Sequence, residues 1–331
     1  MTIIISIVLL IAWLVLVLKW ADYLVDGASS LAFKLGVPSL VIGLTIVSFG
    51  TSAPELVVSV ISAIKWSTQA ALGNVIGSNL FNTLLILGVT SLFASLRVQS
   101  TTVWKEIPFA LLAVVSVFLL GLSDVFNGGQ LLNIDLMGNS SVGILGAAQW
   151  LILLSFFAVF MYYVFGLAQA DSTDSDVPEL LPQWQSWLMI VWWLAALVFW
   201  WQLAVTHAVK LATVIGMSEK IIWLTILSIG TSLPELVTSI KAARKGQSDI
   251  AIGNVVGSNI FNIFWILGVS ALITPIPLIG SNVFDLYALI WATLFLFGLL
   301  FIKRRFHLEK LEWVLMIVAY VAYIIYLIIQ W

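Results

Sequence analysis

Long apolar runs separated by short polar breaks occupy most of the chain. Ten of them are long enough to cross a bilayer as helices, because a hydrocarbon core about 30 Å thick requires roughly 20 apolar residues. These runs cover residues 3–25, 38–64, 70–95, 105–123, 145–168, 185–210, 219–242, 249–274, 282–302 and 310–330. Each run is continuously apolar, whereas a β-barrel strand alternates between apolar and polar residues. The pattern predicts an all-α integral membrane protein with ten transmembrane helices.

The composition supports this fold class and limits the chemistry. Of the 331 residues, 62% are hydrophobic and only 9% are charged, which excludes an ordinary soluble domain. The chain has no cysteine and two histidines, which excludes disulfides, thiolate ligands and a zinc centre built from these histidines alone. We therefore expect no cofactor. Residues 1–18 lack the basic start and the small-residue cleavage site of a signal peptide, so they should begin the first span.

The distribution of lysine and arginine predicts the orientation in the membrane, because cytoplasmic loops are enriched in these residues. With the N-terminus outside, ten basic residues fall in inner loops and three in outer loops. The inner ones are Lys34, Arg97, Lys105, Lys241, Arg244, Lys245, Lys303, Arg304, Arg305 and Lys310, and the outer ones are Lys65, Lys210 and Lys220. Because ten is an even number of spans, both termini are expected outside, in a multi-pass protein of the cell (inner) membrane.

The chain contains an internal repeat. Residues 45–88 match residues 225–268, which lie 180 positions later, with 25 identities in 44 positions and no gap. The copies begin five spans apart, and because five is odd, the second copy should enter the membrane from the opposite side. Such inverted-topology repeats are typical of secondary transporters, which bind substrate near the midplane where the copies meet.

We therefore expect two inverted-topology five-helix repeats. The first covers residues 1–170, with its motif at 43–88, and the second covers residues 184–331, with its motif at 223–268. Residues 171–183 are predicted to form a short acidic cytoplasmic linker, with weak calcium binding as the alternative to a simply solvated segment. Residues 123–141 are expected to form an outer loop or a short hairpin.

Two glutamates, Glu55 and Glu235, lie well inside predicted spans. An ionisable side chain at the centre of a membrane helix costs on the order of 3 kcal/mol, so each is a candidate functional residue. Pro54 and Pro234 directly precede them. Because proline cannot donate a backbone hydrogen bond, both helices are predicted to be kinked or locally unwound, with free carbonyls that point into the bundle.

Neutral oxygen groups accompany each glutamate. Hydroxyls precede the glutamates at Thr51, Ser52, Thr231 and Ser232. On the following helices, polar residues recur at intervals of four and so share one face, namely Asn74, Ser78 and Asn82 and then Asn254, Ser258 and Asn262. Hard cations such as calcium bind six to eight oxygens of these kinds. For Asn74, Asn79, Asn254 and Asn259, hydrogen bonding between helices is an equally good interpretation.

Two copies of G-T-S-x-P-E, each followed by G-N-x-x-G-S-N-x-F-N, resemble the calcium/cation antiporter superfamily and, within it, the prokaryotic sodium/calcium exchangers. The resemblance extends over nearly the whole chain. It implies that the ion ligands include the side chains of Thr51, Ser52, Glu55, Ser78, Asn82, Thr231, Ser232, Glu235 and Ser258 and the backbone carbonyls of Ser48, Thr51, Ser228 and Thr231.

Departures from the family pattern, and a comparison with the other branches of the superfamily, bear on the ions transported. Asn262, also a candidate ligand, stands where many members have an aspartate, so the site keeps two carboxylates, which disfavours potassium-dependent exchange. Ser48 and Ser228 stand where alanine is common. Gly77 and Gly257 stand where the cation/proton branch typically has glutamate, which disfavours that branch.

The resemblance implies a secondary active antiporter that exchanges sodium for calcium across the membrane by alternating access. Na⁺ and Ca²⁺ are then the substrates, and the protein lies in the lipid bilayer. No nucleic acid and no protein partner are expected. A proton-coupled exchanger, or an exchanger of another divalent cation in the same superfamily, is the alternative. No enzyme is expected, because the chain lacks H-E-x-x-H, a Walker-type phosphate loop and a nucleophile with a histidine partner. A channel is disfavoured because an inverted two-fold site indicates alternating access.

Overall fold

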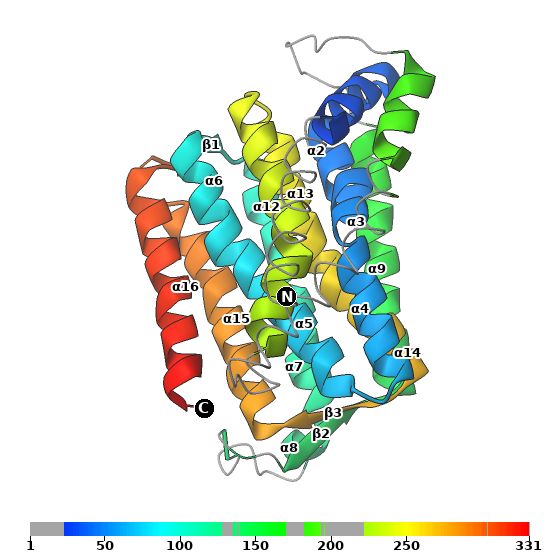
Figure 1. Ribbon diagram of the computed structural model, residues 1–331, viewed down its shortest axis with the longest axis vertical. Helices are drawn as coiled ribbons and strands as arrows, with labels where there is room; N and C mark the ends of the chain where they lie inside the picture. Colours follow the sequence, from blue (N-terminus) through cyan, green and yellow to red (C-terminus); the bar gives the residue numbers. More distant parts are fainter. Residues whose placement is uncertain are drawn as a thin grey trace, which may run out of the picture.

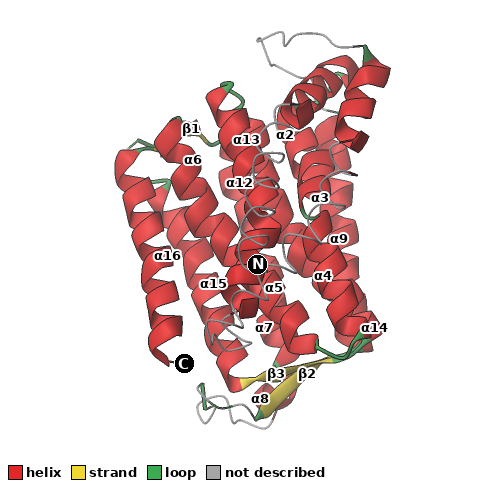
Figure 2. Cartoon of the chain, viewed as in Figure 1, coloured by secondary structure: helices red, strands yellow, loops and turns green. Residues whose placement is uncertain are grey.

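The computed structural model describes residues 23–127, 135, 136, 138, 140–169, 182–192, 195, 222–302 and 304–330. In this part of the chain long helices stand side by side and the strands are few and short (Figures 1 and 2). Seven of these helices are long and apolar enough to cross a membrane, or eight if one bent pair counts as a span. They correspond to eight of the ten predicted runs. Most of the predicted runs 3–25 and 185–210 and nearly all of the predicted linker 171–183 lie outside the described residues.

The first copy of the motif forms a bent helix followed by a long unbroken one, after a helix over residues 23–35. The bent helix contains α2 (Ser39–Ile42), the π-helical segment η1 (Gly43–Val47), α3 (Ser48–Thr51) and α4 (Ala53–Ile64), and the next contains α5 (Thr68–Leu80), η2 (Phe81–Ile86) and α6 (Leu87–Phe93). The chain bends by 46° at Ser52, between α3 and α4. Pro54 lies in the first turn of α4, where its missing N–H leaves no helical hydrogen bond unmade. The predicted kink is confirmed in this copy.

The second copy contains η5 (Ile222–Leu227), α12 (Ser228–Arg244), α13 (Ser248–Ile260), η6 (Phe261–Leu267) and α14 (Gly268–Ile273). Here α12 continues through Pro234, so the predicted local unwinding is wrong for this copy. A membrane helix tolerates an internal proline where polar groups of neighbouring helices surround the freed carbonyl. Pro234 is buried between Ser232 and Glu235, whose side chains meet polar residues of the first copy.

The remaining described helices flank these two motif regions. They are η3 (Thr102–Glu106), α7 (Ile107–Gly121), α8 (Ser123–Asn127), α9 (Ala147–Ala168), α15 (Gly280–Leu299) and α16 (Lys310–Gln330), and residues 183–192 are also helical. In the most apolar stretches of Thr68–Phe93 and Ser248–Ile273, 83% and 78% of the residues are buried, against 17% and 28% in Ala147–Ala168 and Leu311–Ile329. The motif helices therefore form the core, and α9 and α16 present apolar side chains on the outside, as helices in contact with lipid do.

Two small antiparallel ladders join segments that are distant in sequence. At one end of the bundle, β1 (Leu96–Arg97) pairs with β4 (His307–Leu308), and at the other end β2 (Ser141–Leu145) pairs with β3 (Ile276–Ile279) (Figure 1). Within the predicted loop or hairpin at 123–141, Ser123–Asn127 is helical and Ser141 pairs with Ile279, while most of the residues between them lie outside the described part of the chain. Each ladder connects one half of the chain with the other.

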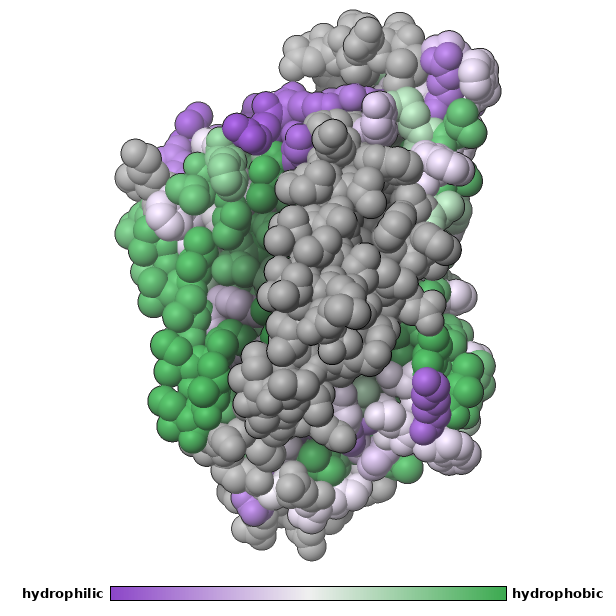
Figure 3. Space-filling view, in the orientation of Figure 1, coloured by the Kyte–Doolittle hydropathy of each residue, from purple (hydrophilic) through white to green (hydrophobic). Residues whose placement is uncertain are grey.

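Basic residues of several predicted inner loops gather at one end. The α12–α13 turn lies at the same end as β1 and β4, whereas the α4–α5 turn and the C-terminus lie at the opposite end (Figure 1). Hydrophilic residues cluster at the first of these ends, above a broad hydrophobic face (Figure 3). This arrangement agrees with the predicted grouping of basic residues, and the side of the membrane that each end faces stays a prediction.

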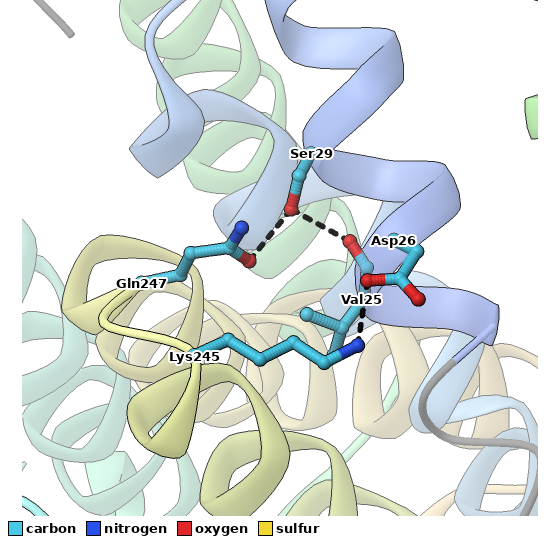
Figure 4. A network of polar contacts seen from close by, with 5 residues as sticks. All are labelled: Val25, Asp26, Ser29, Lys245 and Gln247. Carbon is cyan, nitrogen blue, oxygen red and sulfur yellow. Dashed lines mark hydrogen bonds and ion pairs between the residues drawn. The ribbon is translucent and has the colours of Figure 1, made fainter. Parts of the chain in front are cut away.

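A polar contact at the basic end ties the helix over residues 23–35 to the second copy (Figure 4). Lys245 Nζ forms an ion pair with Asp26 Oδ1 at 2.6 Å. Ser29 Oγ lies 2.6 Å from Gln247 Oε1 and 2.7 Å from the Val25 carbonyl oxygen. The side chains of Lys245 and Asp26 are 32% and 47% exposed, so this pair contributes at most about 1 kcal/mol.

Candidate functional site

The two motif copies interlock around two buried glutamates. Glu55 lies in the first turn of α4 and Glu235 in α12, and neither side chain is exposed to solvent. The segment η1 of the first copy packs on α13 of the second, and α5 packs on η5. Glycines allow this close approach, since a Cβ on Gly77 would lie 2.6 Å from the Leu224 carbonyl oxygen, and one on Gly257 would lie 2.9 Å from that of Leu44.

Each carboxylate receives one serine from its own copy and one from the other copy. Glu55 Oε1 accepts hydrogen bonds from Ser232 Oγ at 2.8 Å and from Ser78 Oγ at 3.4 Å. Glu235 Oε1 accepts from Ser52 Oγ at 3.0 Å and from Ser258 Oγ at 3.4 Å. The two sets are related by the 180-residue offset of the sequence repeat.

The second oxygen of each carboxylate has no hydrogen-bond partner in the described part of the chain. Glu55 Oε2 and Glu235 Oε2 are both buried and unpartnered there, and no described lysine, arginine or histidine forms an ion pair with either residue. An ionised carboxylate in this position costs several kcal/mol unless a counter-charge balances it. Its free lone pairs are suited to a cation.

Hydroxyls and amides extend each network. Thr231 Oγ1 lies 3.2 Å from its acceptor Asn74 Oδ1, and Thr51 Oγ1 lies 2.9 Å from its acceptor Asn254 Oδ1. Asn74 Nδ2 donates to the Glu55 carbonyl at 3.4 Å. Asn254 Nδ2 donates in the same way to the carbonyl of Glu235 at 3.3 Å. Both asparagines therefore connect the glutamate of their own copy with the threonine of the other.

The remaining bonds of the two asparagine amides go to serines of the same copy. Asn74 Nδ2 lies 3.2 Å from Ser59 Oγ, and Asn254 Nδ2 lies 3.0 Å from Ser239 Oγ. These serines follow the glutamates by four residues and recur at the 180-residue offset, a signal that would have found them in the sequence. The sequence analysis did not include them.

Ser48 and Ser228 contribute backbone and not side chain to this region. Their hydroxyls donate back to the Leu44 and Leu224 carbonyls of their own helices, at 2.8 and 2.7 Å. The Ser48 carbonyl instead lies 3.3 Å from Thr51 Oγ1 and 3.5 Å from Ser258 Oγ. The Ser228 carbonyl lies 3.1 Å from the Thr231 hydroxyl.

Asn82 and Asn262 belong to an adjacent asparagine cluster. Both are fully buried. Asn262 Nδ2 donates to Asn79 Oδ1 at 2.9 Å, and Asn79 Nδ2 donates to the Asn259 carbonyl at 3.0 Å. The Asn262 Oδ1 atom and both polar side-chain atoms of Asn82 have no partner among the described residues. The other ten predicted site residues belong to the two hydrogen-bond networks around the glutamates. Asn82 and Asn262 lie outside these networks in the described part of the chain.

Two further buried carboxylates were missed by the sequence analysis. Glu106 accepts a hydrogen bond from Tyr163, and Asp285 Oδ1 accepts one from Tyr323 Oη at 3.1 Å. Each pair joins two spans, η3 with α9 or α15 with α16. The available signal was an acidic residue inside a predicted apolar run, and its tyrosine partner could not be known from sequence.

Comparison with known proteins identifies relatives along the whole chain. The model of the sodium/calcium exchanger protein family matches residues 5–166 and 185–331. The sodium/calcium exchanger MaX1 of Methanosarcina acetivorans is 30% identical over 345 residues, which cover 98% of this chain and 98% of that protein. The inner membrane protein YrbG of Escherichia coli is 39% identical over 276 residues, or 81% of this chain and 79% of YrbG.

A solved structure has the same fold. The sodium-calcium exchanger NCX_Mj, soaked with 10 mM Na⁺ and zero Ca²⁺, superposes with a TM-score of 0.76 and 25% sequence identity, over 97% of this chain and 98% of that chain. The family match spans far more than half of the sequence, and its two segments contain both glutamate networks. The chain therefore belongs to the sodium/calcium exchanger family, a family of multi-pass membrane transporters.

Proposed function

We propose that the protein is a secondary active antiporter that exchanges Na⁺ for Ca²⁺ by alternating access. The observation that carries this proposal is the pair of buried glutamates, each bonded to a serine of the other copy and each with one unpartnered oxygen among the described residues. The names of the family and of relatives such as MaX1 support the choice of ions.

The proposed ligands are oxygens of both copies. They are the side chains of Thr51, Ser52, Glu55, Ser78, Asn82, Thr231, Ser232, Glu235, Ser258 and Asn262, with the backbone carbonyls of Ser48, Thr51, Ser228 and Thr231. Within the described residues no group of three or more His, Cys, Asp or Glu side chains gathers. Two carboxylates and several neutral oxygens therefore have to suffice, a donor set that suits calcium and sodium.

We also propose the architecture of ten spans in two inverted repeats, residues 1–170 and 184–331, joined by a cytoplasmic linker at 171–183. The swapped contacts support this, since Ser52 reaches Glu235 and Ser232 reaches Glu55. An exchange of equivalent contacts is the pattern of a two-fold axis. The basic end of the bundle is proposed to face the cytoplasm of a cell whose inner membrane holds the protein, with both termini outside.

Coupling to protons, or transport of another divalent ion, is the alternative for the same site. The packing around Gly77 argues against the proton branch, in which glutamate is typical at this position. A Cβ there would lie 2.6 Å from Ser228 Oγ, and at Gly257 it would lie 2.7 Å from Ser48 Oγ. Neither place has room for a larger side chain in this arrangement.

The proposal is tested by calcium uptake into proteoliposomes under an imposed sodium gradient at fixed pH. Wild-type protein should take up calcium only when sodium runs in the opposite direction, and Glu55→Gln should abolish uptake. Glu106→Gln is the matched control, because it makes the same substitution at a buried carboxylate bonded to Tyr163. Uptake that follows a proton gradient instead, or near-normal uptake by Glu55→Gln, would refute the proposal.

A further inference from the structure

Asn74 and Asn254 hold equivalent places in the two networks but are not among the proposed ligands. Both amides are fully buried. Each donates to the carbonyl of the glutamate in its own copy, and each accepts the hydroxyl proton of a threonine in the other copy. The same arrangement therefore occurs twice, and in each case it crosses between the copies.

A threonine hydroxyl has one proton and two lone pairs, so the acceptor of its proton decides which atoms remain for a cation. Thr231 Oγ1 lies 3.2 Å from Asn74 Oδ1 and 3.1 Å from the Ser228 carbonyl oxygen. A proton given to the Ser228 carbonyl occupies a lone pair of a proposed ion ligand. A proton given to Asn74 leaves that carbonyl free, and the hydroxyl then presents only lone pairs to the site.

The same choice exists for Thr51 in the other network. Its hydroxyl oxygen lies 2.9 Å from Asn254 Oδ1 and 3.3 Å from the Ser48 carbonyl oxygen. Here the shorter distance favours the amide, because hydrogen bonds weaken as the distance between donor and acceptor grows, whereas at Thr231 the amide and the carbonyl are at nearly equal distances of 3.2 and 3.1 Å. The asparagine therefore competes directly with a backbone carbonyl that is a proposed ligand.

We propose that Asn74 and Asn254 are positioning residues that draw the hydroxyl protons of Thr231 and Thr51 away from the ion site. This inference rests on the proposed function, in which the threonine hydroxyls and the serine carbonyls bind ions. The amide suits the task because it is an uncharged acceptor. An aspartate in its place would add a carboxylate to a site that already has two.

Contacts within each copy fix the orientation of the amide. Asn74 Nδ2 donates to the Glu55 carbonyl and to Ser59 Oγ, at 3.4 and 3.2 Å. A flipped amide would place its oxygen against the Glu55 carbonyl oxygen, and because both are acceptors, that hydrogen bond would be lost. The acceptor atom is thus held toward the threonine of the other copy.

A double-mutant cycle tests the pairing. Calcium uptake into proteoliposomes is measured against calcium concentration for Asn74→Ala, Thr231→Val and the combined variant. Asn74→Ala should raise the half-saturating calcium concentration about fivefold, the value of one hydrogen bond. Thr231→Val also removes a proposed ligand oxygen and should raise it further. Because the amide acts through the Thr231 hydroxyl, the combined variant should be no worse than Thr231→Val alone.

The mismatched pair is the control. Asn74→Ala combined with Thr51→Val removes interactions in two separate networks, so the two single effects should multiply. Ser116→Ala is the neutral control, because that buried hydroxyl donates to the Leu112 carbonyl of its own helix α7, and it should change half-saturation less than twofold. If the Asn74 variants do not fold, Asn254→Ala with Thr51→Val makes the same test in the other network.

Multiplying effects in the matched pair would overturn the inference. So would an Asn74→Ala variant that lowers thermal stability or protein yield but leaves half-saturation unchanged, since that result indicates a purely structural role. Failure of the proposed function is distinguished by the wild-type protein, which would then show no sodium-dependent uptake at all. Thr231→Ser keeps the hydroxyl and should restore near-normal half-saturation.

Discussion

Glu55→Gln and Glu235→Gln are expected to weaken calcium binding by the same large factor. The two carboxylates have equivalent environments. In each, the serine of the other copy lies at 2.8 or 3.0 Å and the serine of the same copy at 3.4 Å. One oxygen of each carboxylate is unpartnered among the described residues. Glutamine keeps the size of the side chain. It replaces a charged oxygen by an N–H donor, which cannot bind a cation.

The magnitude follows from the burial of the site. Both glutamates are fully buried, and no described basic side chain forms an ion pair with either of them. Each carboxylate is therefore available to balance the charge of a bound calcium ion. Removing one partner of a buried pair of charges costs about 3–5 kcal/mol. At 1.4 kcal/mol for each factor of ten, the calcium dissociation constant should rise roughly 100- to 3,000-fold in either variant.

Isothermal titration of the purified protein with calcium in sodium-free buffer measures this change. Glu106→Gln serves again as the matched control and should bind calcium as the wild type does. Binding within tenfold of the wild type by either glutamine variant would refute the assignment of that carboxylate. A difference of more than tenfold between the calcium dissociation constants of the two variants would refute the reasoning from equivalent environments.

Three further outcomes are expected. We expect three sodium ions to exchange for one calcium, which moves one net charge, so the balance point of exchange should shift by about 2.3 kcal/mol per 100 mV in proteoliposomes clamped with potassium and valinomycin. A balance point that ignores voltage would indicate two sodium ions per calcium. Gly77→Ala, whose Cβ would lie 2.6 Å from the Leu224 carbonyl oxygen, should destabilise the protein by about 1–3 kcal/mol in thermal unfolding, whereas Gly166→Ala, with open space around it, should not. Because the native chain has no cysteine, a cysteine at position 65 should react with an impermeant thiol reagent added outside cells and one at position 304 should not; the reverse result would refute the orientation.

The helices could be predicted because their physical cause is local. Run 38–64 corresponds to the helices within Ser39–Ile64, and run 249–274 corresponds to Ser248–Ile273. A helix of about 20 apolar residues is the simplest way to satisfy backbone groups in a bilayer, so length and composition suffice. The repeat also predicted that two glutamates 180 residues apart lie close together, and the structure joins their networks, since Ser52 bonds Glu235 and Ser232 bonds Glu55.

Contacts between distant segments could not be predicted in this way. The strands β2 and β3 are too short to show a periodic pattern, and each finds its partner in the other half of the chain. Glu106 and Asp285 needed Tyr163 and Tyr323 from neighbouring spans, which only the packing of the helices brings near.

The asparagines show a different limit. An amide can donate or accept, so the sequence left Asn74 and Asn254 open between ion binding and helix contacts. In the structure both amides bond the glutamate carbonyl of their own copy and lie within hydrogen-bond distance of a threonine of the other copy, which supports the role in helix contacts. Ser48 and Ser228 are similar, because only the geometry shows that their hydroxyls turn back onto their own helices.

Under the proposed function, the two glutamate networks also explain why the protein exchanges ions and does not let calcium or sodium flow in one direction alone. Without a cation, both carboxylates would be enclosed with serine donors on one oxygen each and no partner, among the described residues, on the other. Enclosing these two charges costs several kcal/mol for each, so the empty site should not pass through a closed state. One calcium or two sodium ions balance the pair and remove that barrier. The binding site can then switch from one side of the membrane to the other only with an ion bound, which couples the movement of one ion to the movement of the other. A third sodium ion leaves one positive charge, and because Asn262 provides no third carboxylate, that charge has to rest on neutral hydroxyl and carbonyl oxygens.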